Sequence, residues 1–171
     1  MNFLKLSSLV LVTFILSGCI GKMPQTADEF RQALAAGAFM TKVESYEVNR
    51  SVADIGKTFK KYAPKCLDVR IETTSQTRTS YQYIVTKYTP TVIANKNRAE
   101  LHVQEKHEKG VMAVYEEPPA GHYVLVLDVT PISKKKSKVD FYGPKMGFDT
   151  MITAVKNWTM GKNLGCPDLT K

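Results

Sequence analysis

The sequence predicts an α+β fold, in which an antiparallel sheet of about six or seven strands packs on a long C-terminal helix. Three observations carry the prediction. Apolar residues recur at helical intervals over 51–63 and again from residue 148 onward. Between these two stretches lie several short runs of strand-forming residues. Only brief turn signals separate the runs, which favours antiparallel pairing of successive strands.

The chain opens with the three parts of an export signal. Lys5 gives it a positive start, residues 6–16 form an apolar core, and two small residues precede Cys19. The core is too short for the roughly 20 residues that a membrane-spanning helix needs. Residues 1–18 are therefore predicted to be a signal peptide that is removed.

The residues at the predicted cleavage site, Leu16-Ser17-Gly18-Cys19, resemble the lipobox of bacterial lipoproteins. The resemblance implies that the Cys19 thiol carries a diacylglycerol group and that the new amino terminus is acylated. Two or three acyl chains are enough for stable anchoring at a membrane surface. Ile20 in place of aspartate resembles the sorting pattern of Gram-negative lipoproteins that face the periplasm from the outer membrane. An uncleaved anchor and a soluble export product are the alternatives.

Removal of residues 1–18 leaves 153 residues with a net charge of +7, the size of one ordinary domain. We expect residues 19–42 to form a lipidated tether with a short helix, and residues 43–171 to form a single α+β domain. A basic periplasmic surface meets anionic headgroups, cell-wall polymers or acidic proteins. Nucleic acid is not an expected partner, because no basic cluster is interleaved with aromatic residues.

Four lysines form the densest charge on the chain, at a predicted turn: Lys134, Lys135, Lys136 and Lys138. Such a tip is commonly a solvated hairpin end that also discourages pairing between sheet edges. Contact with an anionic surface is the alternative.

The first three elements follow from capping patterns and periodicity. Residues 26–29 have the spacing of a capping box and predict a helix over 27–36. Residues 43–48 alternate between apolar and polar side chains and predict a strand. The apolar stripe over 51–63 predicts a second helix, which Pro64 is expected to end.

The remaining elements are further strands and a last helix. Further strands are predicted near residues 67–71, 81–85, 101–103, 111–115 and 139–142. Residues 123–129 are apolar on both faces, so we expect a central strand that is covered on both sides, or covered once and partly shielded, and that ends at Pro131. The apolar positions of the last helix start at Phe148, and Gly161 and Gly165 are expected to end it.

This order of elements resembles the helix-grip arrangement of START-like domains over residues 43–166. The resemblance is one of element order, without a residue motif, and it implies a curved sheet wrapped around the last helix. Other antiparallel α+β sandwiches have the same order and remain an alternative.

With Cys19 assigned to lipid, Cys66 and Cys166 remain. Two thiols in an oxidising compartment are usually paired, so we predict a disulfide between them. The bridge would join the end of the helix over 51–63 to the segment after the last helix.

We expect no metal site, no cofactor and no enzymatic activity. His102 and His107 are five residues apart and point to opposite faces of a strand, and His122 has no companion in the sequence. Asp128 lies alone in an apolar strand, where burial requires a basic neighbour. No catalytic triad order, phosphate loop or close carboxylate pair is present. An enzyme would need a pocket that joins Asp128 to a histidine.

The sequence therefore predicts a membrane-anchored periplasmic lipoprotein that acts as a non-enzymatic interaction or accessory module of the cell envelope. The alternative is a protein that binds a lipid or another small apolar ligand between the sheet and the C-terminal helix. Five aromatic side chains could line such a space, or fill it as core: Tyr81, Tyr83, Phe141, Phe148 and Trp158.

Overall fold

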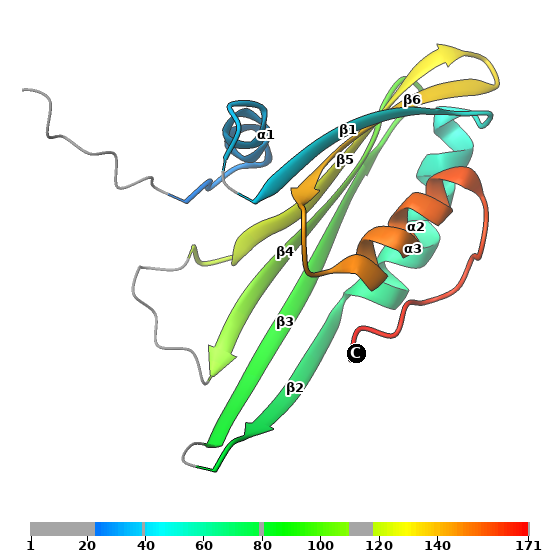
Figure 1. Cartoon of the computed structure of the whole chain (residues 1–171). Helices are drawn as coiled ribbons and strands as arrows, with labels where there is room; N and C mark the ends of the chain where they lie inside the picture. The colour runs from blue at the N-terminus through cyan, green and yellow to red at the C-terminus, as the bar shows by residue number, and fades with distance from the viewer. Residues whose placement is uncertain (1–22, 39, 79–80, 110–117, 171) are drawn as a thin grey trace, which may run out of the picture.

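In the part of the chain that the structure describes, six strands form one antiparallel sheet in the order β1-β6-β5-β4-β3-β2, and three helices pack against it (Figure 1). A computed structural model describes residues 23–38, 40–78, 81–109 and 118–170. In chain order, the elements are α1 (Ala27–Ala35), β1 (Thr41–Val48), α2 (Val52–Leu67), β2 (Val69–Gln76), β3 (Tyr81–Ala94), β4 (Ala99–Lys109), β5 (His122–Ser133), β6 (Lys136–Pro144) and α3 (Asp149–Met160). The predicted α+β class with an antiparallel sheet is confirmed. The strand predicted at 111–115 lies outside the described residues.

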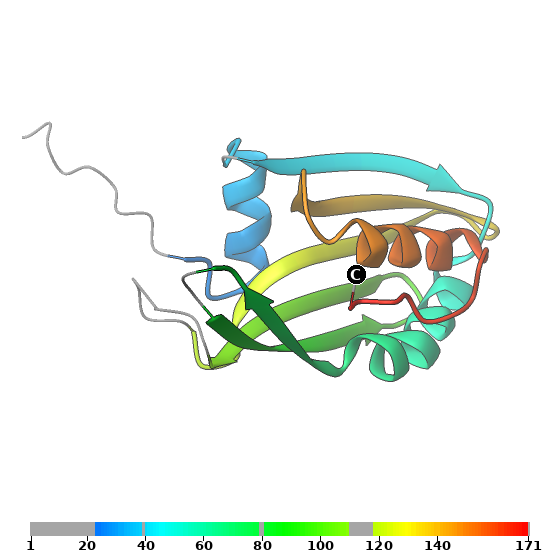
Figure 2. The same cartoon turned by 60° about the horizontal axis from the view of Figure 1, so that its bottom comes forward.

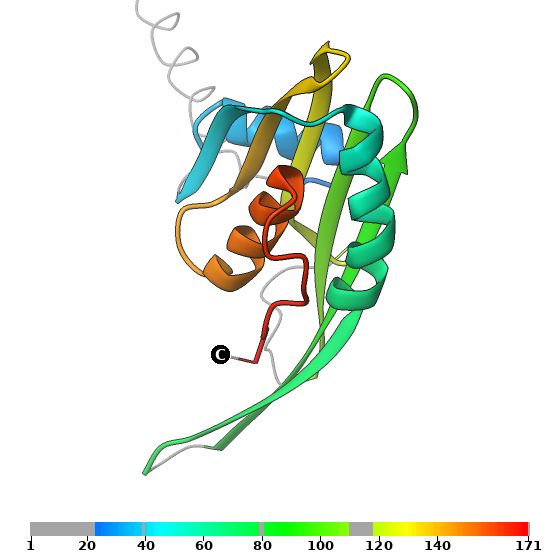
Figure 3. The same ribbon diagram turned by 90° about the vertical axis from the view of Figure 1, so that its right-hand side faces the viewer.

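The helices cover both faces of the sheet (Figures 2 and 3). We call the face under α2 and α3 the helix face, and the opposite face, which α1 covers, the α1 face. Within the described residues, no helix combines the length and the apolar composition that crossing a bilayer requires.

The central strand β5 packs against helices on both sides. Leu125, Leu127 and Val129 are fully buried in the main core on the helix face. Val126 is fully buried in a smaller core on the α1 face, beside Phe30 of α1. The prediction of a central strand covered on both sides is thus confirmed. The strand also continues past Pro131 to Ser133, where its register with β6 shifts.

The helix α2 runs through Pro64 and ends at Leu67, so the prediction that Pro64 ends it is wrong. A proline inside a helix costs about 3 kcal/mol. Its neighbours Ala63, Cys66 and Leu67 are almost fully buried in the main core. Burial of one leucine side chain alone contributes roughly 1.5–3 kcal/mol. Packing of the last turn therefore outweighs the local penalty.

The C-terminal helix α3 has 12 residues and is shorter than α2, which has 16, so the prediction of a long C-terminal helix is wrong. Gly161, at φ 71°, ends α3 in the left-handed conformation that glycine adopts most readily. Arg50 donates hydrogen bonds to the carbonyl oxygens of Trp158 (2.6 Å) and Thr159 (3.2 Å). Its other terminal nitrogen reaches Thr58 Oγ1 in α2 at 2.9 Å. Arg50 thus joins the end of α3 to α2.

A disulfide connects Cys66 in the last turn of α2 to Cys166 after α3. This confirms the predicted pairing.

Candidate functional site

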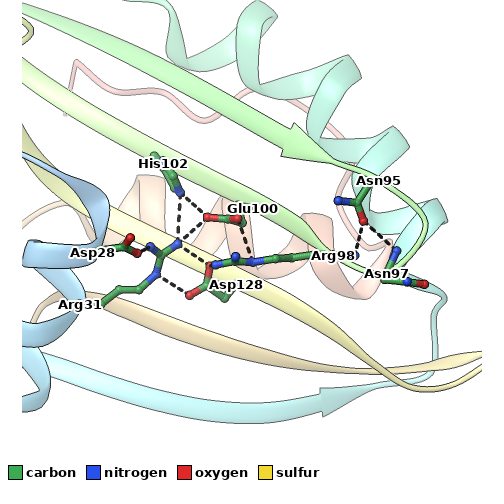
Figure 4. Close-up of polar contacts among 8 residues, drawn as sticks. All are labelled: Asp28, Arg31, Asn95, Asn97, Arg98, Glu100, His102 and Asp128. Carbon is green, nitrogen blue, oxygen red and sulfur yellow. Dashed lines mark hydrogen bonds and ion pairs between the residues drawn. The ribbon is translucent and has the colours of Figure 1, made fainter.

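A cluster of charged side chains lies between α1 and the sheet (Figure 4). We call it the Arg31 cluster, and it consists of Arg31, Arg98, Glu100, His102 and Asp128. Arg31 comes from α1, and Arg98 directly precedes β4. Glu100 of β4 pairs in register with Asp128 of β5, so both carboxylates point to the α1 face. His102, two residues further along β4, lies on the same face.

The guanidinium of Arg31 binds the two buried carboxylates at once, and its Nη1 also donates to the exposed Asp28 at 2.6 Å. Its Nε and Nη2 donate to the two oxygens of Asp128 at 2.6 and 2.7 Å, a bidentate arrangement. Nη2 also donates to Glu100 Oε2 at 2.5 Å. The side chains of Arg31, Asp128 and Glu100 are only 13%, 11% and 7% exposed, respectively. The prediction that Asp128 is buried beside a basic neighbour is confirmed, and the neighbour is 97 residues away in the sequence.

Arg98 and His102 complete the cluster. Arg98 Nε lies 2.8 Å from Glu100 Oε1, and Arg98 remains about half exposed. The turn that presents Arg98 is held by the Asn95 side-chain oxygen, which accepts the backbone N–H groups of residues 97 and 98. His102 Nε2 lies 2.9 Å from Glu100 Oε2. Two guanidinium groups therefore face the two buried carboxylates, and the third carboxylate, Asp28, is exposed to solvent.

Two opposing effects set the pKa of Glu100. Burial raises it, but hydrogen bonds from His102 and Arg31 and the positive charges of Arg98 and Arg31 lower it, and the net pKa lies below the ordinary value. Burial also works against the charged form of Arg31, yet its carboxylate partners raise its pKa overall. Both shifts favour the charged forms of Glu100 and Arg31.

The lowered pKa of Glu100 predicts a loss of stability in acid. The unfolded state takes up a proton near the ordinary value of 4.5, while the folded state still holds Glu100 ionised. The stabilisation is complete above that pH and is lost as the pH falls through the lower folded-state pKa. In urea titrations from about pH 7 to about pH 3, Glu100→Gln should lose less free energy of unfolding with falling pH than the unmodified chain does. Equal pH dependence in the two proteins would contradict the prediction.

A second cluster, which we call the His cluster, lies on the helix face and consists of Glu105, His107 and His122. Glu105 and His107 are two residues apart on β4, and His122 at the start of β5 pairs directly with Glu105. His107 Nε2 lies 3.2 Å from Glu105 Oε1, and His122 Nε2 lies 4.0 Å from Glu105 Oε2. The imidazole centroids are 5.9 Å apart. The expectation that His122 has no companion is wrong.

A β-bulge brings His122 to this face. Val103 pairs with Leu125 and Gln104 pairs with Tyr123, so Val124 is an extra residue in β5. Tyr123 therefore packs with α1, while His122 points to the same face as Leu125. Strict alternation would place His122 on the opposite face.

A glycine lets the two strands approach beside the bulge. Gly121 has φ +83°, and a Cβ there would lie 2.3 Å from the carbonyl oxygen of Glu105. Only glycine accommodates this combination of backbone conformation and close contact, which sets His122 opposite Glu105.

The four lysines for which contact with an anionic surface is the alternative lie in and beside the hairpin between β5 and β6. This hairpin is at the opposite end of the sheet from the start of α1 (Figures 1 and 2). Lys134 and Lys135 are exposed at the tip. Lys136 pairs with Glu47, and Lys138 lies 2.9 Å from Asp140.

The five aromatic residues proposed as a ligand lining are not gathered in one place. Phe141 and Trp158 are almost fully buried in the main core. Phe148 packs edge-on against Tyr88 with ring centroids 6.3 Å apart. Tyr81 is 66% exposed at the start of β3, and Tyr83 is half-buried on the same strand. A ligand between the sheet and α3 would therefore have to displace core side chains or bind beside them.

Sequence reasoning missed Arg31, although a signal for it exists. Ala27, Phe30 and Leu34 are the buried residues of α1. Arg31 follows Ala27 by four residues and precedes Leu34 by three, so it lies within this apolar stripe. A charged residue inside an apolar stripe indicates a buried partner, and Asp128 shows the same pattern on its strand.

The lipobox-like residues 16–19 lie outside the described part of the chain. No family model matches the chain, no curated protein is significantly similar to it, and no solved structure matches it.

Proposed function

We propose that this protein is a lipoprotein of the periplasmic face of the outer membrane, which acts as a non-enzymatic interaction or accessory module of the cell envelope. The observation that carries the proposal is the short distance in sequence between the lipobox-like Cys19 and α1. Residues 20–26 separate them, and α1 is held to the sheet by the Arg31 cluster. Seven residues span at most about 25 Å, so the folded part stays close to the bilayer.

The predicted anchor leads into the end of the sheet opposite the charged hairpin. Since the start of α1 and the β5–β6 hairpin lie at opposite ends of the sheet, we expect the hairpin tip, which carries Lys134 and Lys135, to extend away from the membrane. A lysine tip in this position is suited to an acidic surface on a neighbouring envelope protein.

We also propose that the fold is of the helix-grip kind. Its support is the curved sheet, which holds α2 and α3 on its helix face (Figure 3).

The anchoring part of the proposal predicts lipid attachment at Cys19. Cells that express the chain should incorporate labelled palmitate into it, and the protein should remain in the membrane fraction after a high-salt wash. Cys19→Ala should abolish both results. Cys166→Ala is the matched control, because it removes a thiol that the disulfide uses and should keep the label. An unlabelled full chain would refute the anchor.

The interaction part is tested by capture from crosslinked cells. The full chain should return envelope proteins, and the double variant Lys134→Glu with Lys135→Glu should return less of them at equal abundance. Lys57→Glu is the control, because it reverses an exposed charge on α2, outside the hairpin. If no envelope protein is enriched over a chain with Cys19→Ala, the proposal fails.

A pocket between β3 and the start of α3 supports a second candidate function, the binding of a small apolar ligand. It measures about 360 Å³ and is lined by Tyr88, Phe148, Met151 and Leu169 together with the polar Asp149 and Thr150, so it offers apolar side-chain contact only in part. Ligand pockets are commonly of about this size or larger. Native mass spectrometry of the purified full chain tests this function, and a spectrum without any bound lipid counts against it.

A further inference from the structure

The His cluster brings two imidazoles and one carboxylate together on a rigid surface. Each of the three side chains comes from a paired strand, and all of their ligand atoms lie within 4.8 Å of one another. His107 and His122 are 28% and 21% exposed, and Glu105 is 9% exposed. The carboxylate is thus held within the protein, and the imidazoles leave an approach from solvent.

The distances suit a small divalent ion. Zinc binds imidazole nitrogen at about 2.0–2.1 Å and carboxylate oxygen at about 2.0–2.2 Å, so two ligands of a tetrahedral site lie about 3.3 Å apart. The His107 Nε2 to Glu105 Oε1 distance of 3.2 Å already matches this value. The His122 Nε2 to Glu105 Oε2 distance of 4.0 Å needs a small rotation of a partly exposed ring.

Neighbouring strand residues position the ligands. Thr86 of β3 pairs with His107, and its Oγ1 lies 3.2 Å from His107 Nδ1. A hydrogen bond at Nδ1 orients the ring and directs Nε2 toward Glu105, as outer partners of metal-binding histidines commonly do. Tyr88, which pairs with Glu105, has its pKa raised to about 12 by burial and by the negative charge of Glu105.

The Arg31 cluster provides an internal comparison. Glu100 and His102 have the same spacing on β4 as Glu105 and His107, and their side chains also lie in contact, at 2.9 Å. There, however, the guanidinium of Arg31 occupies the position between the carboxylates. In the His cluster, the third group is His122, whose imidazole can offer a nitrogen to a metal ion, whereas a guanidinium can only donate hydrogen bonds.

We propose that Glu105, His107 and His122 form a binding site for a divalent transition-metal ion, with Zn²⁺ as the preferred occupant. Three protein ligands leave one tetrahedral position for water or for a donor from a partner. Imidazole nitrogen favours zinc and its neighbours in the first transition series over Mg²⁺ and Ca²⁺, which prefer oxygen ligands alone. The site is independent of lipid anchoring at Cys19.

Metal binding is measured on the untagged full chain in detergent, after treatment with a chelator and dialysis against Zn²⁺. We expect one Zn²⁺ per chain. His107→Gln and His122→Gln should each weaken binding at least about ten-fold, because each removes a ligand. His102→Gln is the matched control, because His102 is the remaining histidine of the sequence and lies on the other face of the sheet. This variant should change the affinity by less than about two-fold.

Spectroscopy of the unaltered chain keeps the proposal testable if a variant misfolds. Co²⁺ should give the visible absorption of a four-coordinate site, and Cu²⁺ should show magnetic coupling to two imidazole nitrogens. The absence of bound Zn²⁺, or undiminished binding in the folded double variant of His107 and His122, would overturn the proposal. Coupling of Cu²⁺ to no nitrogen would overturn it as well.

Discussion

Arg31→Leu is expected to lower the free energy of unfolding by about 3 kcal/mol, because it leaves two buried carboxylates without their main partner. Asp128 would lose both of its hydrogen bonds from Arg31, and Glu100 would lose one. Arg98 remains beside them, but it is about half exposed and compensates only in part. Urea denaturation at neutral pH measures the loss.

Arg98→Leu is the matched control for Arg31→Leu. It removes an arginine from the same cluster, but from a solvent-exposed position, where an ion pair contributes at most about 1 kcal/mol. Hydrogen exchange should also show faster exchange of the α1 amides in Arg31→Leu than in Arg98→Leu. Equal losses in the two variants would mean that burial does not distinguish the arginines, and the description of α1 as held by Arg31 would fail.

Arg31→Leu also connects the stability of the fold to the proposed function. While α1 is held to the sheet, residues 20–26 connect Cys19 to the folded part; if α1 detaches, the connection to the sheet extends over residues 20–40. A longer connection holds the sheet less closely to the membrane. Arg31→Leu should therefore reduce crosslinking to membrane-bound neighbours while the label at Cys19 stays unchanged.

Removal of the disulfide in the double variant Cys66→Ala with Cys166→Ala is expected to lower the free energy of unfolding by about 4 kcal/mol. The bridge joins residues 100 positions apart, and a loop of that length restricts the unfolded chain strongly. It also holds the segment after α3 against the last turn of α2, where Cys66 is almost fully buried. Urea denaturation of the two proteins measures the difference.

Reduction provides an independent check on the disulfide. The unaltered chain in reductant should approach the stability of the double variant, and its oxidised form should migrate faster in non-reducing electrophoresis. The double variant should show neither change. Two titratable thiols in the native, unreduced protein would exclude the bridge.

Much of the fold could be predicted, because local patterns carry it. The helices α1 and α2 begin at predicted caps: the side chains of Thr26 and Ser51 accept the N–H groups of Glu29 and Asp54. The doubly apolar run of β5 identified the centre of the sheet. The prediction failed at Pro64, because the propensity of one residue is smaller than the packing of the turn around it.

Neither polar cluster could be predicted as an arrangement. Arg31 and Asp128 each interrupt an apolar pattern, but the pairing of α1 with the sheet depends on contacts 97 residues apart. The sequence pattern assigns His122 to no site, because the bulge at Val124, which turns His122 toward Glu105, leaves no sequence pattern of its own.

The sequence by itself determined the class of fold, the central strand and the cysteine pair, since periodicity, turn residues and the number of thiols are properties of short stretches and of composition. Only the tertiary structure decided which charged residues share a site. A one-residue change of register moves every side chain of a strand to the other face. The bulge in β5 makes such a change between Asp128 and His122, so His122 lies on the helix face with Glu105 and His107, while Asp128 lies on the α1 face with Glu100.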